Sequence, residues 1–460
     1  MKNKGKAAGL LCLALLFGGQ ASAQSVEIAL KAPETQTTTA KERTLPAQES
    51  GTAAARKTAG GNAATASVNK VRLVWAPIPG AVKYKLVVRS SKEKRPDNIV
   101  TTQKQIFANG CELDMRAWRS GAADYYWQVC GLNYDGQEIG ACTDLKPLAE
   151  AESNTDAPLP VTEFTQMDYA PLYPAYSWIP FLGSDNYEIQ VWKKGLVGSD
   201  QQIRDLYVTG STYYDDAGYT DPGGYYWKIR ALDASGGVLS SWSKNAEFRV
   251  IRPTPVAALG DSITHGGGAI STGPGLQIYD WETYSAVPIK NLGYSGNTVE
   301  AMCERFERDV LPFSPKILVI MGGVNNYRAG DSAWAVIHNL AVLRDKCHQY
   351  GIIPVFATVT PLNPTDIAKV GFVETPPADW LWQQQRINAW IMQQPYAVNV
   401  TSRLTDYRGW LRADYTSDGL HPDADGKKYI GEAVSSYLQN TFPDITVPLM
   451  KKKASPIPQS

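Results

Sequence analysis

The chain has 460 residues, of which 43% are hydrophobic and 20% are charged, the composition of a soluble protein with several folded domains. Its 45 basic and 45 acidic residues balance to a net charge of +0, so the total charge gives no support to a nucleic-acid partner. Beyond the N-terminus, no stretch is long and apolar enough for a transmembrane helix.

Residues 1–23 have the pattern of a cleavable export signal. Three lysines among the first six residues precede a short apolar stretch, which ends at the small-residue site Ala21-Ser22-Ala23. We therefore expect export, with a final location in the periplasm, on the cell surface or outside the cell. Residues 24–66 are rich in Ala, Thr, Lys and Gly and lack sustained periodicity, so they are predicted to be a disordered tether.

The cysteines indicate at most two disulfides. Five of the six lie beyond the predicted signal, and an odd number leaves at least one thiol unpaired. Cys130 and Cys142 flank the turn-forming sequence Asn133-Tyr134-Asp135-Gly136 and could face each other across a hairpin; two buried free thiols are the alternative. No CxxC spacing occurs, so a zinc ribbon or a thioredoxin-type redox site is not expected.

Two segments repeat one pattern, which indicates a domain duplication. Each has a tryptophan followed by Pro, Gly and an alternating run that begins with Tyr, and later a Tyr-Tyr-Trp sequence. The matching tryptophans are Trp75 and Trp127 in the first segment and Trp178 and Trp227 in the second. The alternation predicts antiparallel β-sandwiches over 67–150 and 158–252. The pattern resembles fibronectin type III modules.

From Thr254 onward, short apolar strands alternate with amphipathic helices. The predicted strands cover 256–259, 316–321, 352–358 and 396–400. The predicted helices run from the cap Asp331-Ser332 to Gly351, over 380–393, and through a last stretch with Ile430 and Val434. Over 254–441 this alternation predicts a parallel sheet with helices on both faces, and ligands in such sheets bind beyond the carboxyl ends of the strands. Residues 442–460 are predicted to be a flexible tail.

Two short motifs beside these elements carry residues suited to nucleophilic catalysis. Ser262, in Gly260-Asp261-Ser262, directly follows the first strand, where a serine can project into the crevice at the sheet edge. Asp418 and His421 precede the last helix. A catalytic serine needs a base to take its proton and a carboxylate to orient that base, and one tight turn could supply both. Each motif alone also occurs by chance in ordinary turns.

The chain has only four histidines, so few residues are candidates for the base. His338 and His348 fall in a predicted helix, where structural roles are more usual. His265, three residues after Ser262, is the main competitor, but it has no carboxylate at a comparable spacing. His421 is therefore the predicted base.

Two loops offer hydrogen-bond donors to an oxyanion. Residues 291–298 are predicted to form a glycine-rich turn with exposed backbone N–H groups, and residues 322–326 place an asparagine amide just past a buried strand. Fixed donors at such a position stabilise the transition state of acyl transfer by several kcal/mol. A turn glycine and a loop-capping asparagine are the structural alternatives.

In their order and their placement after strands, these four motifs resemble the four blocks of the SGNH/GDSL hydrolase family, over residues 255–440. The resemblance implies a flavodoxin-like three-layer α/β/α fold. It also implies that Ser262 is the nucleophile and that Asp418 and His421 complete a catalytic triad. The implied oxyanion hole consists of the backbone N–H of Ser262, Gly296 and the Asn325 amide.

Two details qualify the resemblance. Gly293 is a less favoured alternative to Gly296, and the aspartate that follows the oxyanion asparagine in the family is here Asn326. Because that aspartate takes no part in the chemistry, we expect little effect on activity. The motifs GxSxG, HExxH and the P-loop are absent from the sequence. The implied mechanism requires neither a metal nor an organic cofactor.

The sequence thus predicts a secreted serine esterase that hydrolyses acyl esters, acetyl esters above all, on polysaccharide. Tyr279, Trp281 and Tyr284 lie between the first two blocks and could line the substrate pocket; core packing is the alternative for each. A lipase or thioesterase for longer acyl chains is a second possibility, because the fold does not set acyl size. A surface glycan-binding protein with a vestigial esterase domain is a third.

Overall fold

The computed structural model describes residues 69–116, 118, 124–153, 155–268, 273–370 and 375–453. The predicted export signal and tether lie outside these residues. All described residues belong to one compact unit of the chain. Within the described part, no helix combines the length and the apolar character that a membrane span needs.

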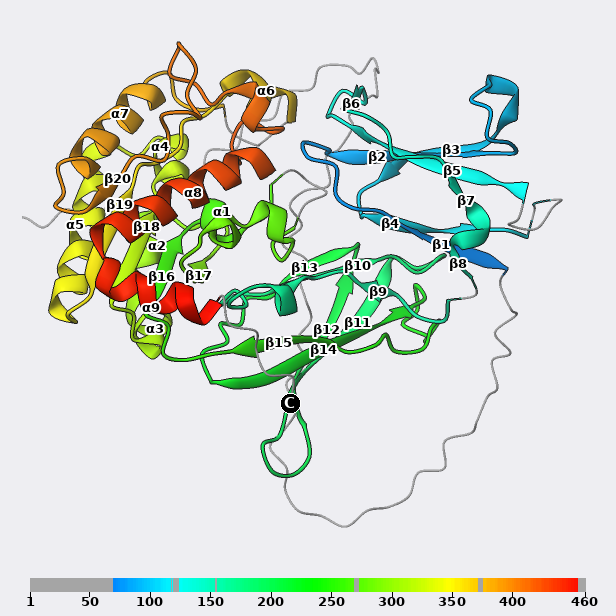
Figure 1. Cartoon of the computed structure of the whole chain (residues 1–460), viewed down its shortest axis with the longest axis horizontal. Helices are drawn as coiled ribbons and strands as arrows, with labels where there is room; N and C mark the ends of the chain where they lie inside the picture. Colours follow the sequence, from blue (N-terminus) through cyan, green and yellow to red (C-terminus); the bar gives the residue numbers. More distant parts are fainter. Residues whose placement is uncertain are drawn as a thin grey trace, which may run out of the picture. The chain divides into compact units, whose positions relative to one another are not determined.

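The first β-rich region consists of two antiparallel sheets with the strand orders β4-β1-β8 and β3-β2-β5-β6 (Figure 1). The strands are β1 (Lys70–Val74), β2 (Lys83–Arg89), β3 (Ile99–Ile106), β4 (Gly110–Asp114), β5 (Tyr126–Leu132), β6 (Glu138–Ile139), β7 (Lys146–Pro147) and β8 (Glu152–Ser153). The two sheets share one buried core, in which Leu73 of the first sheet packs with Tyr84 and Trp127 of the second. The Cys130–Cys142 disulfide closes the hairpin after β5, so the paired alternative of the sequence analysis holds.

The second β-rich region also has two antiparallel sheets, with the strand orders β13-β10-β9 and β12-β11-β14-β15. Its strands are β9 (Leu159–Pro160), β10 (Ala175–Ile179), β11 (Asn186–Lys193), β12 (Gln201–Thr209), β13 (Thr212–Tyr214), β14 (Gly223–Leu232) and β15 (Ala246–Val250). Trp178 and Trp227, the repeat tryptophans, are fully buried with Tyr187. Both regions are consistent with the β-sandwiches that the repeat predicts.

The C-terminal region has a parallel five-stranded sheet in the order β17-β16-β18-β19-β20. The strands are β16 (Val256–Gly260), β17 (Lys290–Gly293), β18 (Ile317–Met321), β19 (Ile353–Ala357) and β20 (Ala397–Val398). The helices are α1 (Ser262–His265), α2 (Val299–Glu304), α3 (Phe306–Asp309), α4 (Val324–Ala329), α5 (Ala333–Gln349), α6 (Pro364–Val370), α7 (Trp380–Ile391), α8 (Ala424–Thr441) and α9 (Pro443–Lys453). Helix α5 packs with α2 and α7, and α8 packs with α9 (Figure 1). This arrangement fits the predicted α/β fold.

Two sequence predictions differ from the structure. The glycine-rich turn predicted over 291–298 begins as strand β17, whose Lys290 and Asn291 are buried. Their polar atoms find buried partners: Lys290 Nζ donates to the Ala170 carbonyl over 2.5 Å, and Asn291 Nδ2 donates to the Thr264 carbonyl over 2.5 Å. Because half of its residues are polar, this strand lacks the apolar run by which a buried strand is predicted from sequence.

The second difference concerns the C-terminus. Residues 443–453, predicted as part of a flexible tail over 442–460, form helix α9. Phe442 is buried, and Ile445 and Leu449 of the helix pack against the hydrophobic core. The i, i+4 spacing of those two side chains gives the helix an apolar stripe, and burying it favours the helix over a disordered tail.

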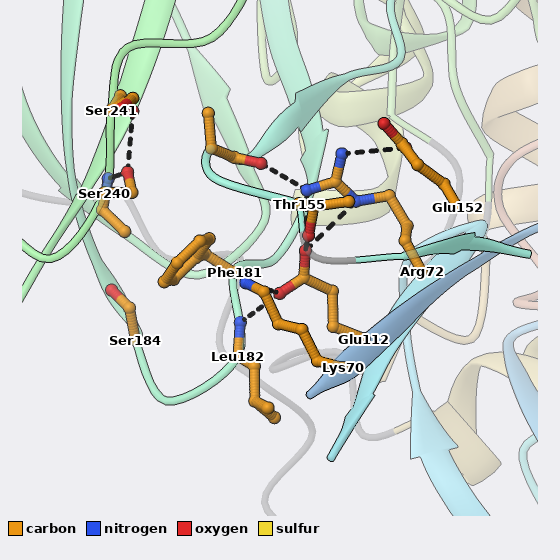
Figure 2. A network of polar contacts seen from close by, with 12 residues as sticks. Lys70, Arg72, Glu112, Glu152, Thr155, Phe181, Leu182, Ser184, Ser240 and Ser241 are labelled. Atoms are coloured by element: carbon orange, nitrogen blue, oxygen red, sulfur yellow. Dashed lines mark hydrogen bonds and ion pairs between the residues drawn. The ribbon is translucent and has the colours of Figure 1, made fainter. Parts of the chain in front are cut away.

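A buried carboxylate joins the two β-rich regions (Figure 2). Glu112 of β4 accepts hydrogen bonds from Lys70 Nζ and Arg72 Nη2, each over 2.7 Å. It also accepts from the backbone N–H of Leu182 in the second region, over 2.9 Å. The Lys70 ammonium lies 3.3 Å from the centre of the Phe181 ring. The two regions therefore meet at a buried ion pair.

Candidate active site

The turn that follows β16 presents Ser262. A side chain on Gly260 would place its Cβ 2.3 Å from Thr264 Oγ1 and 2.6 Å from the Met321 carbonyl, so only glycine fits at the end of the strand. The buried Asp261 caps α1, because its carboxylate accepts from the Ile263 N–H over 3.0 Å. Burial raises the pKa of Asp261 to about 6. Ser262 thus starts a one-turn helix at the carboxyl edge of the sheet.

The loop before α8 brings a histidine and an aspartate to this serine. His421 Nε2 lies 2.9 Å from Ser262 Oγ, and His421 Nδ1 lies 2.7 Å from Asp418 Oδ2. The other Asp418 oxygen accepts from the backbone N–H groups of Leu420, over 2.8 Å, and His421, over 2.7 Å. The structure therefore joins the three predicted residues in one hydrogen-bonded series, the order in which serine hydrolases use them.

The environment of Asp418 favours its ionised form. Burial alone would raise the pKa of this carboxyl, but the His421 ring and the N–H groups of the turn lower it further than burial raises it, so the net pKa lies below its usual range. An ionised carboxylate at Nδ1 leaves Nε2 as the acceptor for the serine proton.

Thr416 holds the turn that carries these residues, and the sequence analysis did not single it out. Its Oγ1 donates to the His421 carbonyl over 2.8 Å and accepts from the Gly419 N–H over 2.9 Å. Gly419 has φ +79°, and a Cβ there would lie 2.4 Å from the Asn363 carbonyl. A threonine two residues before an aspartate is a turn-forming pattern, but such a pattern occurs too often to identify an active site.

The two predicted oxyanion loops follow the strands on either side of β16. Gly260 is in register with Gly293 of β17 and with Met321 of β18, so the loops leave one edge of the sheet together. Gly296, with φ +83°, is exposed, and no atom lies within 4 Å of a Cβ added there. Asn325 lies in the first turn of α4, and its amide donates to the Asn297 carbonyl over 2.9 Å.

Gly293, the alternative to Gly296, is packed against α1. A Cβ on Gly293 would lie 2.2 Å from the His265 backbone nitrogen, so this glycine allows two backbones to approach closely.

Asn326, which replaces the family's aspartate, has a structural role. It is fully buried, its Oδ1 accepts from the Val299 N–H over 3.0 Å, and its Nδ2 donates to the carboxylates of Glu300, over 2.8 Å, and Asp331, over 2.9 Å. An aspartate here would put a third carboxylate beside those two.

His265, the competing base, occupies a different position. Its Nδ1 lies 2.8 Å from Ser295 Oγ, and its Nε2 lies 2.6 Å from the Tyr173 carbonyl of the second β-rich region. Burial lowers the pKa of this ring to about 4. With both nitrogens engaged, the neutral ring links the Ser295 loop to the second region.

The three aromatic residues predicted to line the pocket pack inside the fold. Trp281 is fully buried, and Tyr279 is buried in a small cluster with Leu276 and Ala424. Tyr284 is half-buried and donates its hydroxyl to the Ile278 carbonyl over 2.9 Å. They belong to two 3-10 helices, Gln277–Tyr279 and Trp281–Tyr284, that pack against α8. The burial of Trp281 and Tyr279 favours the packing alternative for these two residues.

A buried lysine supports the nucleophile turn from α8. Lys427 is fully buried, and its Nζ donates to the Ile263 carbonyl over 2.6 Å. Burial lowers its pKa, and the nearby carboxylates of Asp280 and Glu282 oppose that shift. Lys427 shares the helical spacing of the core residue Ile430. A lysine on an otherwise apolar face was the available signal, but such a lysine usually extends to solvent.

Among the described residues, one group has the ligands and spacing to hold a metal ion, namely Cys130, Glu138 and Cys142. The disulfide consumes both of its thiols. A cysteine binds a metal ion as its thiolate, so this group does not suit a metal in the oxidised protein.

A serine, a histidine and a carboxylate in series beyond the carboxyl ends of parallel strands define the geometry of a serine hydrolase. Residues 258–429 match the family model described as the GDSL-like Lipase/Acylhydrolase family. The match spans Ser262, Gly296, Asn325, Asp418 and His421, and it implies a carboxylic ester hydrolase.

Three similar solved structures illustrate the comparison. The lipase/acylhydrolase from Enterococcus faecalis is 20% identical, with a TM-score of 0.33, over 41% of this chain and 96% of that one. A GDSL-like lipase from Bacteroides thetaiotaomicron is 19% identical, with a TM-score of 0.32, over 41% and 88%. A variant of an acetyl-xylooligosaccharide esterase from Geobacillus is 18% identical, with a TM-score of 0.32, over 41% and 95%. No curated protein matches the chain.

Proposed function

We propose that the protein is a serine esterase with Ser262 as its nucleophile and His421 as its base. The observation that carries this proposal is the continuous series from Ser262 Oγ through His421 to the buried Asp418. Ser262 Oγ attacks the ester carbonyl carbon while its proton passes to His421 Nε2. Asp418 holds the ring in orientation and stabilises the imidazolium that forms.

The oxyanion of the tetrahedral intermediate is held by donors from three neighbouring loops. These donors are the backbone N–H groups of Ser262 and Gly296 and the Asn325 amide. The bond from Asn325 to the Asn297 carbonyl uses one of its two amide protons, which leaves the other to point toward the substrate. Fixed donors of this kind cost little reorganisation during the reaction.

Collapse of the intermediate breaks the bond between the carbonyl carbon and the leaving oxygen, which takes the proton from His421. This step leaves an acyl group on Ser262. A water molecule then gives a proton to His421 and attacks the acyl carbon, and the second collapse returns the proton to Ser262 Oγ and releases the acid. All proton transfers pass through one ring, so neither a metal nor a cofactor enters these steps.

We infer that the natural esters are short acyl groups, acetyl above all, carried on polysaccharide outside the cytoplasm. The sequence pattern of an export signal supports this placement, as do the two β-rich regions, for which we keep the fibronectin type III assignment as a proposal. Turnover of a series of 4-nitrophenyl esters tests the acyl preference. A steep fall beyond acetyl supports it, and retained turnover of octanoyl esters favours a lipase or thioesterase.

The assignment of the nucleophile is tested by the Ser262→Ala variant, assayed with 4-nitrophenyl acetate. We expect kcat to fall about a thousandfold or more while the fold persists, because residual rates come from the oxyanion donors alone. Ser436→Ala, which changes an exposed serine of α8, is the matched control. Equal rates in Ser262→Ala and the wild type would refute the proposed nucleophile.

A further inference from the structure

A cleft separate from the triad lies beyond the carboxyl ends of two other strands. It has a volume of about 310 Å³ and is bounded by α7, by Thr358 after β19, and by the segment 399–409 after β20. Small-molecule sites begin at roughly 300 Å³. Because β18 alone stands between β16 and β19, the cleft begins about 10 Å along the same sheet edge from Ser262.

The cleft wall is polar but uncharged. Among the described residues that line it, none is acidic or basic, and most carry an amide or a hydroxyl group. The polar side chains of the wall belong to Thr358, Gln384, Gln385, Asn388, Asn399, Thr401 and Thr405. Leu381 and Met392 add a small apolar patch. Such a wall suits a neutral ligand with many hydroxyl groups and an apolar ring face, because it offers hydrogen bonds without an unpaired charge.

Hydrogen bonds fix which end of two amides in the wall is offered to a ligand, whereas the amide of Asn388 is bonded at both ends to the Val359 backbone. Asn399 Oδ1 accepts from the backbone N–H groups of Thr401, over 3.0 Å, and Ser402, over 3.2 Å, so its amide nitrogen is the free end. Gln384 Nε2 donates to the Val359 carbonyl over 2.8 Å, so its oxygen is the free end. The wall thus presents an oriented donor and an oriented acceptor, which lowers the ordering cost of binding.

We propose that this cleft binds a neutral saccharide ring of the acylated substrate, one or more sugar units away from the ester at Ser262. Vicinal hydroxyl groups donate to Gln384 Oε1 and accept from Asn399 Nδ2, while Gln385 offers an exposed amide with both functions. This inference rests on the proposed esterase for its link to catalysis. A small activated ester reaches only the triad, whereas an oligosaccharide reaches both places.

Two variants test the cleft without touching the triad. Asn399→Asp keeps the oxygen that accepts from Thr401 and Ser402 but removes the donor, and Gln385→Ala removes an exposed amide. Gln393→Ala, an exposed glutamine just after α7 that does not line the cleft, is the control. We expect kcat/KM on acetylated xylo-oligosaccharides to fall about tenfold per lost hydrogen bond. We expect kcat/KM on 4-nitrophenyl acetate to stay unchanged.

Titration calorimetry with unacetylated xylohexaose and cellohexaose tests the cleft independently of catalysis. Binding of either sugar that weakens about tenfold in Asn399→Asp and is unchanged in Gln393→Ala supports the proposal. Absence of binding of both sugars overturns it, as does an equal loss on the glycan and on the small ester. If the wild-type protein binds the sugars but hydrolyses no ester, the proposed esterase activity is refuted and the proposed saccharide site is retained.

Discussion

The two β-rich regions each contain a pair of antiparallel sheets, but they differ in how they join the rest of the protein. The second region and the α/β region share one continuous hydrophobic core. Two buried hydrogen bonds also link these regions. His265 Nε2 contacts the Tyr173 carbonyl, and the Tyr173 hydroxyl donates to Asp309 over 2.7 Å. The first region has a core of its own, and its contacts with the second region combine the hydrogen bonds of Glu112 with the packing of Ile179 against Gly110. One copy of the repeat thus shares its core with the α/β region, and the other does not.

The two attachments also reach different parts of the active site. His265 connects the second region to Ser295, next to the proposed oxyanion glycine Gly296. Ser417, next to Asp418, donates its hydroxyl to the Gly80 carbonyl of the first region over 2.8 Å. We therefore expect damage to the second region to weaken both stability and catalysis, and damage to the first region to weaken mainly its own folding.

Among the changes that compare the two regions, His265→Ala should have the largest effect. The change leaves the buried Tyr173 carbonyl without its donor and opens a cavity, which should cost about 3 kcal/mol of unfolding free energy. It should also lower kcat on 4-nitrophenyl acetate at least about tenfold, because the Ser295 loop loses its anchor. Urea unfolding and steady-state kinetics measure both effects. His348→Ala, at an exposed histidine of α5, is the control, and equal behaviour of the two variants would contradict the account.

Glu112→Gln should break the other attachment. The carboxylate is buried with Lys70 and Arg72, so removing its charge leaves two buried cations poorly compensated, at a cost of about 3 kcal/mol. We expect the first region to unfold earlier, with kcat on the small ester changed less than about threefold. Hydrogen exchange of β1 and β4 reports the opening, and Glu150→Gln, at an exposed site, is the control. Faster exchange in β16 and β18 instead would show that the two regions do not differ in this way.

The pKa values of buried carboxyl groups shift in opposite directions in the first region and in the α/β region. Burial alone would raise the pKa of Glu112, but its bonds from Lys70, Thr155 and the Leu182 N–H hold the pKa below the usual range. For Asp280 and Glu282 of the α/β region, the nearby Lys427 charge opposes burial only in part, and burial raises the pKa of both. Folding thus favours the ionised form of Glu112 in the first region and the protonated forms of Asp280 and Glu282 in the α/β region.

The sign of the pH effect follows from proton binding. Between about pH 4, where unfolded carboxyl groups titrate, and the raised value of about 7 for Asp280, the folded state binds more protons than the unfolded state. Stability should therefore fall as pH rises, by up to about 1.4 kcal/mol per pH unit for each group. In Glu282→Gln, the free energy of unfolding should decrease less steeply with pH, and the variant should be more stable than the wild type at pH 8. Denaturation from pH 5 to 8 checks this, and a parallel slope in the variant would contradict it.

The smallest effect is expected from Ser417→Ala. The variant loses one partly buried hydrogen bond to Gly80, worth about 1 kcal/mol, and the Thr416 bonds that hold the turn remain. We expect kcat to fall less than about fivefold, with KM for 4-nitrophenyl acetate unchanged. A fall of a hundredfold would mean that the first region is as important to catalysis as the second.

The sequence predicted those elements whose patterns are local. The apolar run Ile317–Met321 and the helix from Ala333 to Gln349 occur as predicted, because a buried strand and an amphipathic helix each carry their own periodicity. The spacing of Asp418 and His421 also describes one turn, so local geometry alone aligns them. Ser262 lies 159 residues from His421, and the order of the family blocks was needed to connect them.

Features that depend on distant partners could not be predicted in this way. The polar strand Lys290–Gly293 is stable because the Ala170 and Thr264 carbonyls meet its side chains. Trp281 is buried only because Gly431 of α8 allows close contact; a Cβ there would lie 2.1 Å from the Trp281 carbonyl. The roles of His265 and Lys427 likewise follow from contacts that no sequence spacing encodes.

Labelling with a fluorophosphonate, followed by peptide mass spectrometry, tests the central claim most directly, because only a serine activated by a neighbouring base reacts quickly. If Ser262 is the nucleophile, we expect a single adduct on the peptide that contains Ser262. Its formation should be strongly slowed in His421→Ala and absent in Ser262→Ala. An enzyme that hydrolyses 4-nitrophenyl acetate but carries its adduct on another residue, or carries none, would contradict the proposed nucleophile.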